Sequence, residues 1–350
     1  MEISTPGRIC LFGEHQDYLG LPVIAMAISL RVRIVGKKRK DRQVILHKPD
    51  LKTTENFLID DSSYVKKRDY FRSGINICKN EGLEFSNGFE CYINSDIPIQ
   101  AGTSSSSAIV VSWLHFLSYM SDNKIIWTKE KIGELAYKAE VLEFAEPGGM
   151  MDQFSTAMGG MVYIESEPKR YVKKINTSLG SFVLGDSCQK KETITILARC
   201  KNLRFDIINK IKARNQDFDL HSSQLDVDLS NLSNMEKHLF YNTIKNRDLL
   251  KEAKNELEKD NPNHHIIGNL LNEQHIILRD SLGISTNKIE SMINAANSSG
   301  ALGCKINGSG GGGCMFAFAP ENPERVAKAI ESVGGKSYIV YADEGTNALI

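Results

Sequence analysis

The spacing of apolar residues changes along the chain and predicts both strands and helices. From Ile28 to Ile34 the apolar residues take every second position, which is the period of a strand with one buried face. In other stretches they recur every three or four positions, as on the buried face of a helix. We expect strands over 3–11, 28–34, 44–46, 89–94, 161–164 and 181–184, and helices over 64–79, 107–120, 128–144 and 150–158.

The second half of the chain has a different pattern. Composition shifts near residue 165, and residues 200–280 are rich in Lys, Glu, Asn and Leu with helical spacing. The chain ends with an expected strand, helix and strand over 314–319, 323–333 and 338–342. A length of 350 residues suits about two domains. We therefore predict an α+β fold with an N-terminal lobe over 1–165, a C-terminal lobe over 166–350 and an active site in the cleft between them.

Composition and charge exclude several classes of protein. Lys plus Arg and Asp plus Glu both number 43, so no net charge attracts nucleic acid or a membrane surface. The stretch from Met1 to Leu11 lacks the apolar core of a signal peptide, and no run of about 18 apolar residues could span a bilayer. The 7 cysteines are scattered and form no Cys-x-x-Cys pair. This favours reduced thiols in a cytoplasmic protein over disulfides or a zinc site.

A loop of small residues, which we call the serine loop, covers Ala101-Gly102-Thr103-Ser104-Ser105-Ser106-Ser107 and precedes the expected helix 107–120. Gly and Ser let the backbone approach an anion closely, and the free N–H groups and dipole of a helix N-terminus attract negative charge. The hydroxyls can reach phosphate oxygens or a metal ion. A flexible linker has a similar composition, but linkers are rarely followed at once by an apolar helix. The loop is therefore predicted to bind phosphate.

Three further stretches carry candidate chemistry. Five glycines fall within residues 308–313, the glycine loop, where the backbone passes close to another group or turns in a hairpin. Near the N-terminus, Pro6-Gly7-Arg8 is followed by the polar cluster Gly13-Glu14-His15-Gln16-Asp17-Tyr18. Asp152 follows the helix-breaking Pro147-Gly148-Gly149 and lies among apolar residues, where a carboxylate is costly unless it has a partner or a function. An acid in the first turn of a helix is the simpler interpretation of Asp152.

The order and spacing of these motifs resemble the GHMP kinase family, named for galactokinase, homoserine, mevalonate and phosphomevalonate kinases. The three family motifs correspond to residues 6–18, the serine loop and the glycine loop, and the first motif and residues 149–154 are most similar to galactokinase. The resemblance covers nearly the whole chain. It implies an N-terminal lobe like ribosomal protein S5 and a ferredoxin-like C-terminal α/β lobe. It also implies ATP-dependent phosphorylation of a monosaccharide at the anomeric C1 hydroxyl.

The resemblance assigns the nucleotide and its metal ion to the two loops. ATP would contact the following residues: Gly102, Thr103, Ser104, Ser105, Ser106, Ser107 and Gly310. Mg²⁺ would be held by Ser106 and Glu140, because this cation prefers oxygen ligands. Glu143, one helical turn further along, competes with Glu140 for this role. Without the resemblance, Glu140 would be interpreted as a surface charge on a helix.

The resemblance assigns the acceptor to the N-terminal cluster and to Asp152. Asp152 would be the catalytic base, and Arg8 would lie beside it and orient the attacking oxygen. Sugar hydroxyls would be bound by Glu14, His15, Asp17 and Gly149. Asp186 is a further candidate, in a segment that departs from the family. Within the family the Glu-His-x-Asp set accompanies phosphorylation of a sugar at its anomeric hydroxyl, which argues against mevalonate or homoserine as the acceptor.

Three departures from galactokinase leave the choice of sugar open. Leu19-Gly20-Leu21 replaces a sequence of the Asn-Gly-Gly type, two serine-loop residues differ, and the segment 185–192 lacks the tyrosine of the galactose pocket. Lys190 in that segment would suit a uronic acid or a heptose phosphate. Two other functions use the same fold, a non-catalytic regulator that binds sugar and ATP, and a decarboxylase. The cluster of Glu14, His15 and Asp17 argues against the decarboxylase.

Overall fold

The computed structural model describes residues 1–98, 101–190, 193–221 and 227–349, so Ile99 and Gln100, just before the serine loop, lie outside the described residues. The strands form an 8-stranded sheet and a 4-stranded sheet. The 8-stranded sheet contains β1 (Glu2–Phe12), β2 (Val23–Lys38), β3 (Gln43–Lys48), β4 (Thr53–Leu58), β5 (Phe89–Ser95), β6 (Met161–Glu165), β7 (Tyr171–Ile175) and β12 (Asn347–Leu349). Its order is β12-β1-β2-β5-β3-β4, with β6 paired to both β2 and β7.

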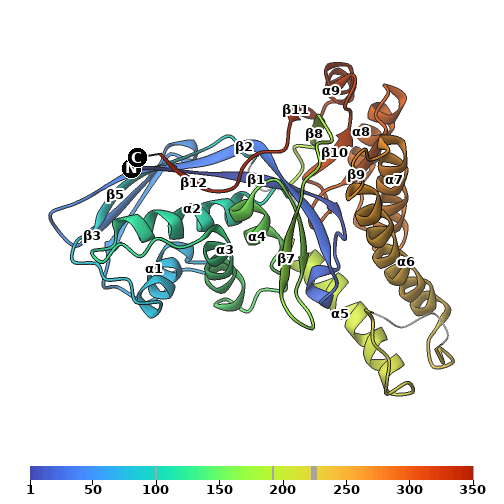
Figure 1. Ribbon diagram of the computed structural model, residues 1–350, viewed down its shortest axis with the longest axis horizontal. Helices are drawn as coiled ribbons and strands as arrows, with labels where there is room; N and C mark the ends of the chain where they lie inside the picture. Colours follow the sequence, from blue (N-terminus) through green and yellow to red (C-terminus); the bar gives the residue numbers. More distant parts are fainter. Residues whose placement is uncertain (99–100, 191–192, 222–226, 350) are drawn as a thin grey trace.

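The helices of the N-terminal lobe cover one face of this sheet (Figure 1). They are α1 (Tyr70–Asn80), α2 (Ser105–Met120), α3 (Lys129–Tyr137), the π-helical turn η3 (Lys138–Leu142) and α4 (Met151–Met158). The short 3₁₀ turns η1 (Asp17–Leu19) and η2 (Pro49–Leu51) lie in the loops. Helix α2 is the centre of this core, because Val110, Trp113 and Phe116 are fully buried between β1, β2 and the other helices.

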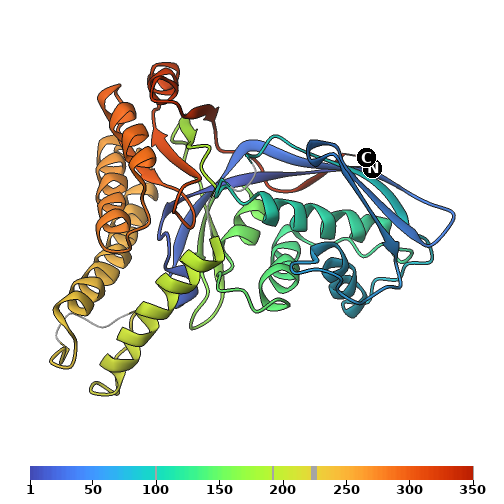
Figure 2. The ribbon, with the colours of Figure 1, turned by 180° about the vertical axis from the view of Figure 1, so that it is seen from behind.

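The C-terminal lobe is built on the 4-stranded antiparallel sheet, in the order β11-β8-β10-β9. Its strands are β8 (Phe182–Asp186), β9 (Gly303–Ile306), β10 (Cys314–Phe318) and β11 (Lys336–Val340), and its helices are α5 (Thr193–Lys212), α6 (Asn234–Leu257), α7 (His264–Asp280), α8 (Asn287–Ser298) and α9 (Pro323–Ser332). Helices α7, α8 and α9 pack against the sheet, and the two lobes lie end to end in both views (Figures 1 and 2). This mixed architecture confirms the predicted α+β class.

Glycine at position 7 allows the serine loop to lie against β1. A Cβ atom at Gly7 would come within 2.8 Å of the carbonyl oxygen of Thr103. The same carbonyl oxygen accepts a hydrogen bond of 3.1 Å from the backbone N–H of Arg8. Because no side chain intervenes, the start of α2 is fixed directly over the strand that carries Arg8. This close approach brings the first two sequence motifs together.

Several predicted boundaries differ from the structure. The expected helix over 128–144 ends at Tyr137 and continues as the π-helical turn η3, and the helix expected from residue 64 begins at Tyr70. Strands β7 and β12 follow the predicted lobe boundary at residue 165 but pair in the 8-stranded sheet. The N- and C-termini therefore lie side by side (Figure 1).

Within the described ranges, no helix is long and apolar enough to cross a membrane.

Candidate active site

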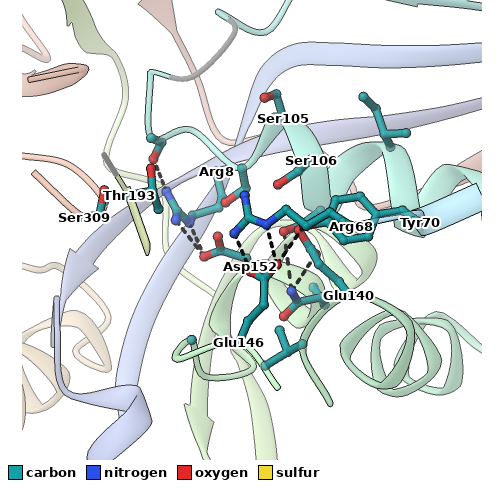
Figure 3. Close-up of a pocket in the computed structure, with 18 of the residues that line it drawn as sticks. Arg8, Arg68, Tyr70, Ser105, Ser106, Glu140, Glu146, Asp152, Thr193 and Ser309 are labelled. Carbon is teal, nitrogen blue, oxygen red and sulfur yellow. Dashed lines mark hydrogen bonds and ion pairs between the residues drawn. The ribbon is translucent and has the colours of Figure 1, made fainter. Parts of the chain in front are cut away.

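A cavity of about 480 Å³ lies where the two lobes meet. Its wall is formed by β1 and the loop after it, the N-terminus of α2, the turn η3, the first turn of α4, the start of α5 and the glycine loop. Figure 3 shows part of this wall, with Arg8 and Asp152 between the serine loop on one side and Ser309 on the other. The cavity thus joins all three sequence motifs.

The serine loop turns the chain so that α2 begins at the cavity. Gly102 has a φ of 87° and Ser104 a φ of 60°, both in the left-handed region, and α2 starts at Ser105. Ser105 and Ser106 line the cavity at the first helical turn, where backbone N–H groups have no partner within a helix. The hydroxyl of Ser104 is buried and has no hydrogen-bond partner among the described residues. Donors in this arrangement at a helix N-terminus can bind an anion.

The π-helical turn places the carboxylate of Glu140 in the cavity. Glu140 is only 5% exposed, and its Oε2 accepts a hydrogen bond of 2.7 Å from Nε2 of Gln153. Burial raises the pKa of Glu140 to about 7, although hydrogen bonds from Gln153, Ser107 and Ser106 oppose the rise. Glu143 is exposed and bonds the hydroxyl of Tyr64 instead. Of the two competing glutamates, Glu140 is therefore the one that faces the serine loop.

The oxygen groups around Glu140 fit a hard divalent cation. The buried carboxylate lies next to the hydroxyls of Ser106 and Ser107, and Oε1 of Gln153 has no hydrogen-bond partner among the described residues. Across all residues that the structure describes, no group of three or more His, Cys, Asp or Glu side chains could hold a metal ion. An ion held here would therefore take few ligands from the protein. Mg²⁺ binds in this way, because it keeps several waters and shares substrate phosphates.

Asp152 and Arg8 form an ion pair at the centre of the cavity. Nε and Nη2 of Arg8 donate to Oδ1 of Asp152 at 2.9 and 2.6 Å, and Nη1 donates to the carbonyl oxygen of Gly102. Arg8 is 3% exposed; its burial opposes a charge, but the carboxylates of Asp152 and Glu14 raise its pKa. The Asp152 side chain is 31% exposed, and its Oδ2 has no hydrogen-bond partner among the described residues. This oxygen can accept a hydroxyl of a ligand.

The carboxylate of Asp17 lines the cavity near Asp152. A Cβ atom at Gly149 would come within 2.3 Å of Oδ2 of Asp17, so glycine is needed there for the carboxylate to fit. Burial, and then the charge of Asp152, raise the pKa of Asp17 to about 6. Its Oδ1 accepts the backbone N–H of Tyr18 at 2.9 Å. The absence of a side chain at Gly149 thus leaves room for the Asp17 carboxylate, which lines the cavity.

Glu14 and His15 hold the glycine loop in place. Oε2 of Glu14 accepts hydrogen bonds from Nζ of Lys305 at 3.1 Å and from the backbone N–H of Gly308 at 2.8 Å. Nδ1 of His15 lies 2.9 Å from the hydroxyl of Tyr18, and its Nε2 lies 3.1 Å from the carbonyl oxygen of Ser309. Both side chains line the cavity, but they already have partners within the protein. Their direct contact with a sugar stays a prediction.

Three of the predicted site residues do not line the cavity. Asp186 ends β8, and its carboxylate accepts the backbone N–H of Cys188 at 2.8 Å. Gly310 packs against Ile284, where a Cβ atom would meet that side chain at 2.6 Å. Thr103 lies within the serine loop but is fully buried and does not line the cavity. From the glycine loop, Gly308 and Ser309 line the cavity instead.

One wall of the cavity is formed by residues that the sequence does not single out. Arg68 and Glu146, which are 78 positions apart, form a bidentate ion pair. The hydroxyl of Tyr70 donates to Oε1 of Glu146 at 3.3 Å. Two lysines from the same side, Lys48 and Lys66, bind Glu55. The apolar residues of this wall are Leu51, Phe71, Ile93, Ile109 and Val141. A mixed apolar and cationic wall next to an anion site suits a nucleoside with its phosphates.

Comparisons with known proteins agree with this geometry. The profile described as "GHMP kinases N terminal domain" matches residues 68–160, "GHMP kinases C terminal" matches 247–336, and "Galactokinase galactose-binding signature" matches 2–38. The mevalonate kinase of Thermococcus onnurineus (strain NA1) is 30% identical, covering 98% of this chain and 96% of the relative. The galactokinase of Clostridium beijerinckii is 26% identical, covering 99% and 94%. The chain therefore belongs to the GHMP kinase family.

A solved structure supports the fold. The structure of Lactococcus lactis galactokinase complexed with galactose is 22% identical and superposes with a TM-score of 0.80, covering 99% of this chain and 95% of that one. Mevalonate kinases of Thermococcus and Pyrococcus species match at 26–30% identity and galactokinases at 24–26%. The relatives therefore do not decide between a sugar and mevalonate, and the expectation from the Glu-His-x-Asp set stays a prediction.

Proposed function

We propose that the protein transfers the terminal phosphoryl group of ATP to the anomeric hydroxyl of a neutral monosaccharide. One observation carries the proposal: a single cavity joins the anion site at the N-terminus of α2, the Arg8–Asp152 pair and the carboxylate of Asp17. Phosphoryl transfer needs these parts, a cradle for the phosphates and groups that position the attacking hydroxyl. The galactose-binding signature over residues 2–38 supports a sugar as the acceptor.

The nucleotide would lie on the wall of the serine loop. Backbone N–H groups at Ser105 and Ser106 would bind the phosphates, and the apolar wall around Phe71 would cover the base. Ser106 and Glu140 would hold Mg²⁺, which when bound neutralises negative charge on the phosphates. Without the ion, the buried carboxylate of Glu140 stays partly protonated near pH 7. The donor side therefore has both an anion cradle and a cation site.

Asp152 would orient the acceptor hydroxyl and accept its proton. Oδ1 of Asp152 is bound by Arg8, whereas Oδ2 faces the cavity and can accept the hydroxyl hydrogen. Arg8 keeps the carboxylate in one orientation, and its bond to Gly102 places positive charge next to the serine loop, where the phosphates would bind. Because a paired carboxylate is a weak base, positioning and charge compensation contribute more to the rate than proton removal does.

The charges on the acceptor side favour a neutral substrate. Among the described residues that line the cavity next to Asp152, where the acceptor would bind, Glu14, Asp17 and Asp152 carry carboxylates and Arg8 is the single cation. Lys305 binds Glu14 from behind and does not line the cavity. The guanidinium of Arg8 already binds Asp152. A carboxylate or phosphate on the acceptor would therefore meet repulsion without a counter-charge. Lys190, the residue that would suit a uronic acid or a heptose phosphate, does not line the cavity.

A second candidate function is phosphorylation of mevalonate, because a mevalonate kinase is 30% identical over 98% of this chain. The two candidates differ in the charge of the acceptor, since mevalonate is a carboxylate. A regulator that binds sugar and ATP without turnover would share the fold but would not need the pair of Arg8 and Asp152. Release of ADP separates all three functions.

The test measures ADP release from ATP and Mg²⁺ with D-galactose, other neutral hexoses, a uronic acid, a heptose phosphate and mevalonate. We expect turnover with at least one neutral hexose, little with the anionic acceptors, and a kcat lowered by about 10²- to 10⁴-fold in Asp152→Asn. Turnover confined to mevalonate or to an anionic sugar would contradict the neutral acceptor. Binding of sugar and ATP without any ADP release would indicate the regulator.

A further inference from the structure

The hydroxyl of Ser309 is an unused polar group in the wall of the cavity. Ser309 is 6% exposed, it lines the cavity, and its Oγ has no hydrogen-bond partner among the described residues. Buried hydroxyls without a partner are rare in folded proteins, because burial removes the water that would otherwise bind them. A group of this kind in a cavity wall is therefore expected to bind a ligand.

Hydrogen bonds on both sides fix Ser309 in position. The backbone N–H of the preceding residue, Gly308, binds Glu14 at 2.8 Å. The carbonyl oxygen of Ser309 can only accept, so Nε2 of His15 carries a proton, and Nδ1 of His15 lies 2.9 Å from the hydroxyl of Tyr18. Arg204 of α5, which is 2% exposed, donates to the same hydroxyl of Tyr18. The Ser309 hydroxyl thus lies on a rigid backbone.

Ser309 lies on the acceptor side of the cavity. The carbonyl oxygen of Ser309 contacts His15 of the N-terminal cluster, whereas the preceding residue, Gly308, lies between Glu14 and Gly102 of the serine loop. In Figure 3, the pair of Arg8 and Asp152 separates Ser309 from the wall with Ser105, Ser106 and Arg68, where the nucleotide would lie. The hydroxyl is therefore placed for the group that receives the phosphate.

We propose that Ser309 hydrogen-bonds a hydroxyl group of the acceptor sugar and contributes to the choice of sugar. A serine hydroxyl can donate and accept at once, which matches a sugar hydroxyl. Of the two glycine-loop residues that line the cavity, Gly308 and Ser309, Ser309 carries a side-chain hydroxyl without a partner among the described residues. This inference rests on the proposed function and adds a residue to its acceptor site.

The test combines Ser309→Ala with a set of deoxy sugars. With the best neutral hexose, the variant is expected to lower kcat/KM by about 3- to 10-fold, the loss of one neutral hydrogen bond. The KM for ATP is expected to stay unchanged. When each hydroxyl of the sugar is removed in turn, the difference between wild type and variant should disappear for one deoxy sugar and persist for the others.

Ser187→Ala is the matched control. Ser187 is 3% exposed and lies next to the same loop, where its backbone N–H binds Gly313, but its hydroxyl accepts the backbone N–H of Gln189 and does not line the cavity. This variant should turn over every sugar like the wild type. An unchanged kcat/KM in Ser309→Ala, an equal loss with every deoxy sugar, or a raised KM for ATP would overturn the proposal. If the wild type turns over no sugar, the proposed function fails and this assignment fails with it.

Discussion

The pKa of Glu140 gives a prediction that does not depend on knowing the acceptor. Its rise from 4.5 to about 7 means that the folded protein binds this proton more tightly than the unfolded chain does. The proton therefore stabilises the folded state fully below about pH 4.5, and this contribution is lost as the pH rises through about 7. The difference corresponds to about 3 kcal/mol, since Glu140 is only 5% exposed.

Glu140→Gln removes this pH dependence. The amide has a similar shape and can still accept the hydrogen bond from Gln153, but it carries no charge. Above pH 8 and without Mg²⁺, the variant should be more stable than the wild type by about 3 kcal/mol, and near pH 4.5 the two should be equal. Mg²⁺ should stabilise the wild type at high pH and leave the variant unchanged, because the variant lacks the anionic ligand.

The assay is the free energy of unfolding in urea at several pH values, with and without Mg²⁺. Glu143→Gln is the control, since Glu143 is exposed and bonds Tyr64 away from the serine loop. Comparing variants cancels the titration of all other groups. The reasoning would be refuted if Glu140→Gln followed the wild type at every pH, or if Mg²⁺ stabilised both proteins equally.

Three further predictions concern the acceptor side. Asp152→Asn should lower kcat by about 10²- to 10⁴-fold with an unchanged KM for ATP. If steady-state kinetics showed a loss of kcat below 10-fold, this would argue against the proposed role of Asp152. In the wild type, kcat/KM for the sugar should fall as the pH drops through about 6, where Asp17 becomes protonated, and a pH profile of Asp17→Asn should lack this limb. Lys305→Met leaves the charge of Glu14 buried alone and should cost about 3–5 kcal/mol in urea unfolding, whereas Lys305→Met combined with Glu14→Gln should recover part of it.

The strand, the loop of small residues and the helix around the serine loop could be predicted from the sequence. Small residues between a strand and an apolar helix indicated an anion site, and α2 begins at Ser105 as that pattern requires. The contact between Arg8 and Asp152, 144 positions apart, could not be derived from spacing alone. The family resemblance predicted this contact. The spacing of apolar residues reports only local structure and cannot show which distant residues meet.

Other features had no local signal in the sequence. The apolar spacing from Ile132 to Ala139 continues regularly, so nothing in it marks the π-helical turn that carries Glu140. The pair of Arg68 and Glu146 joins two loops, and loop positions lack the period that predicts contacts. In the glycine loop the glycines drew attention to Gly310, although the cavity is lined by Ser309.

The central claim is that phosphate is transferred to the anomeric hydroxyl of a neutral sugar. The most direct measurement is ³¹P NMR of the product formed from ATP, Mg²⁺ and the best neutral hexose of the panel. The account predicts a new phosphate monoester resonance that is coupled to the anomeric proton of the sugar and grows about 10²- to 10⁴-fold more slowly with Asp152→Asn. A monoester coupled to any other sugar proton, or a product formed only with mevalonate or an anionic sugar, would contradict it.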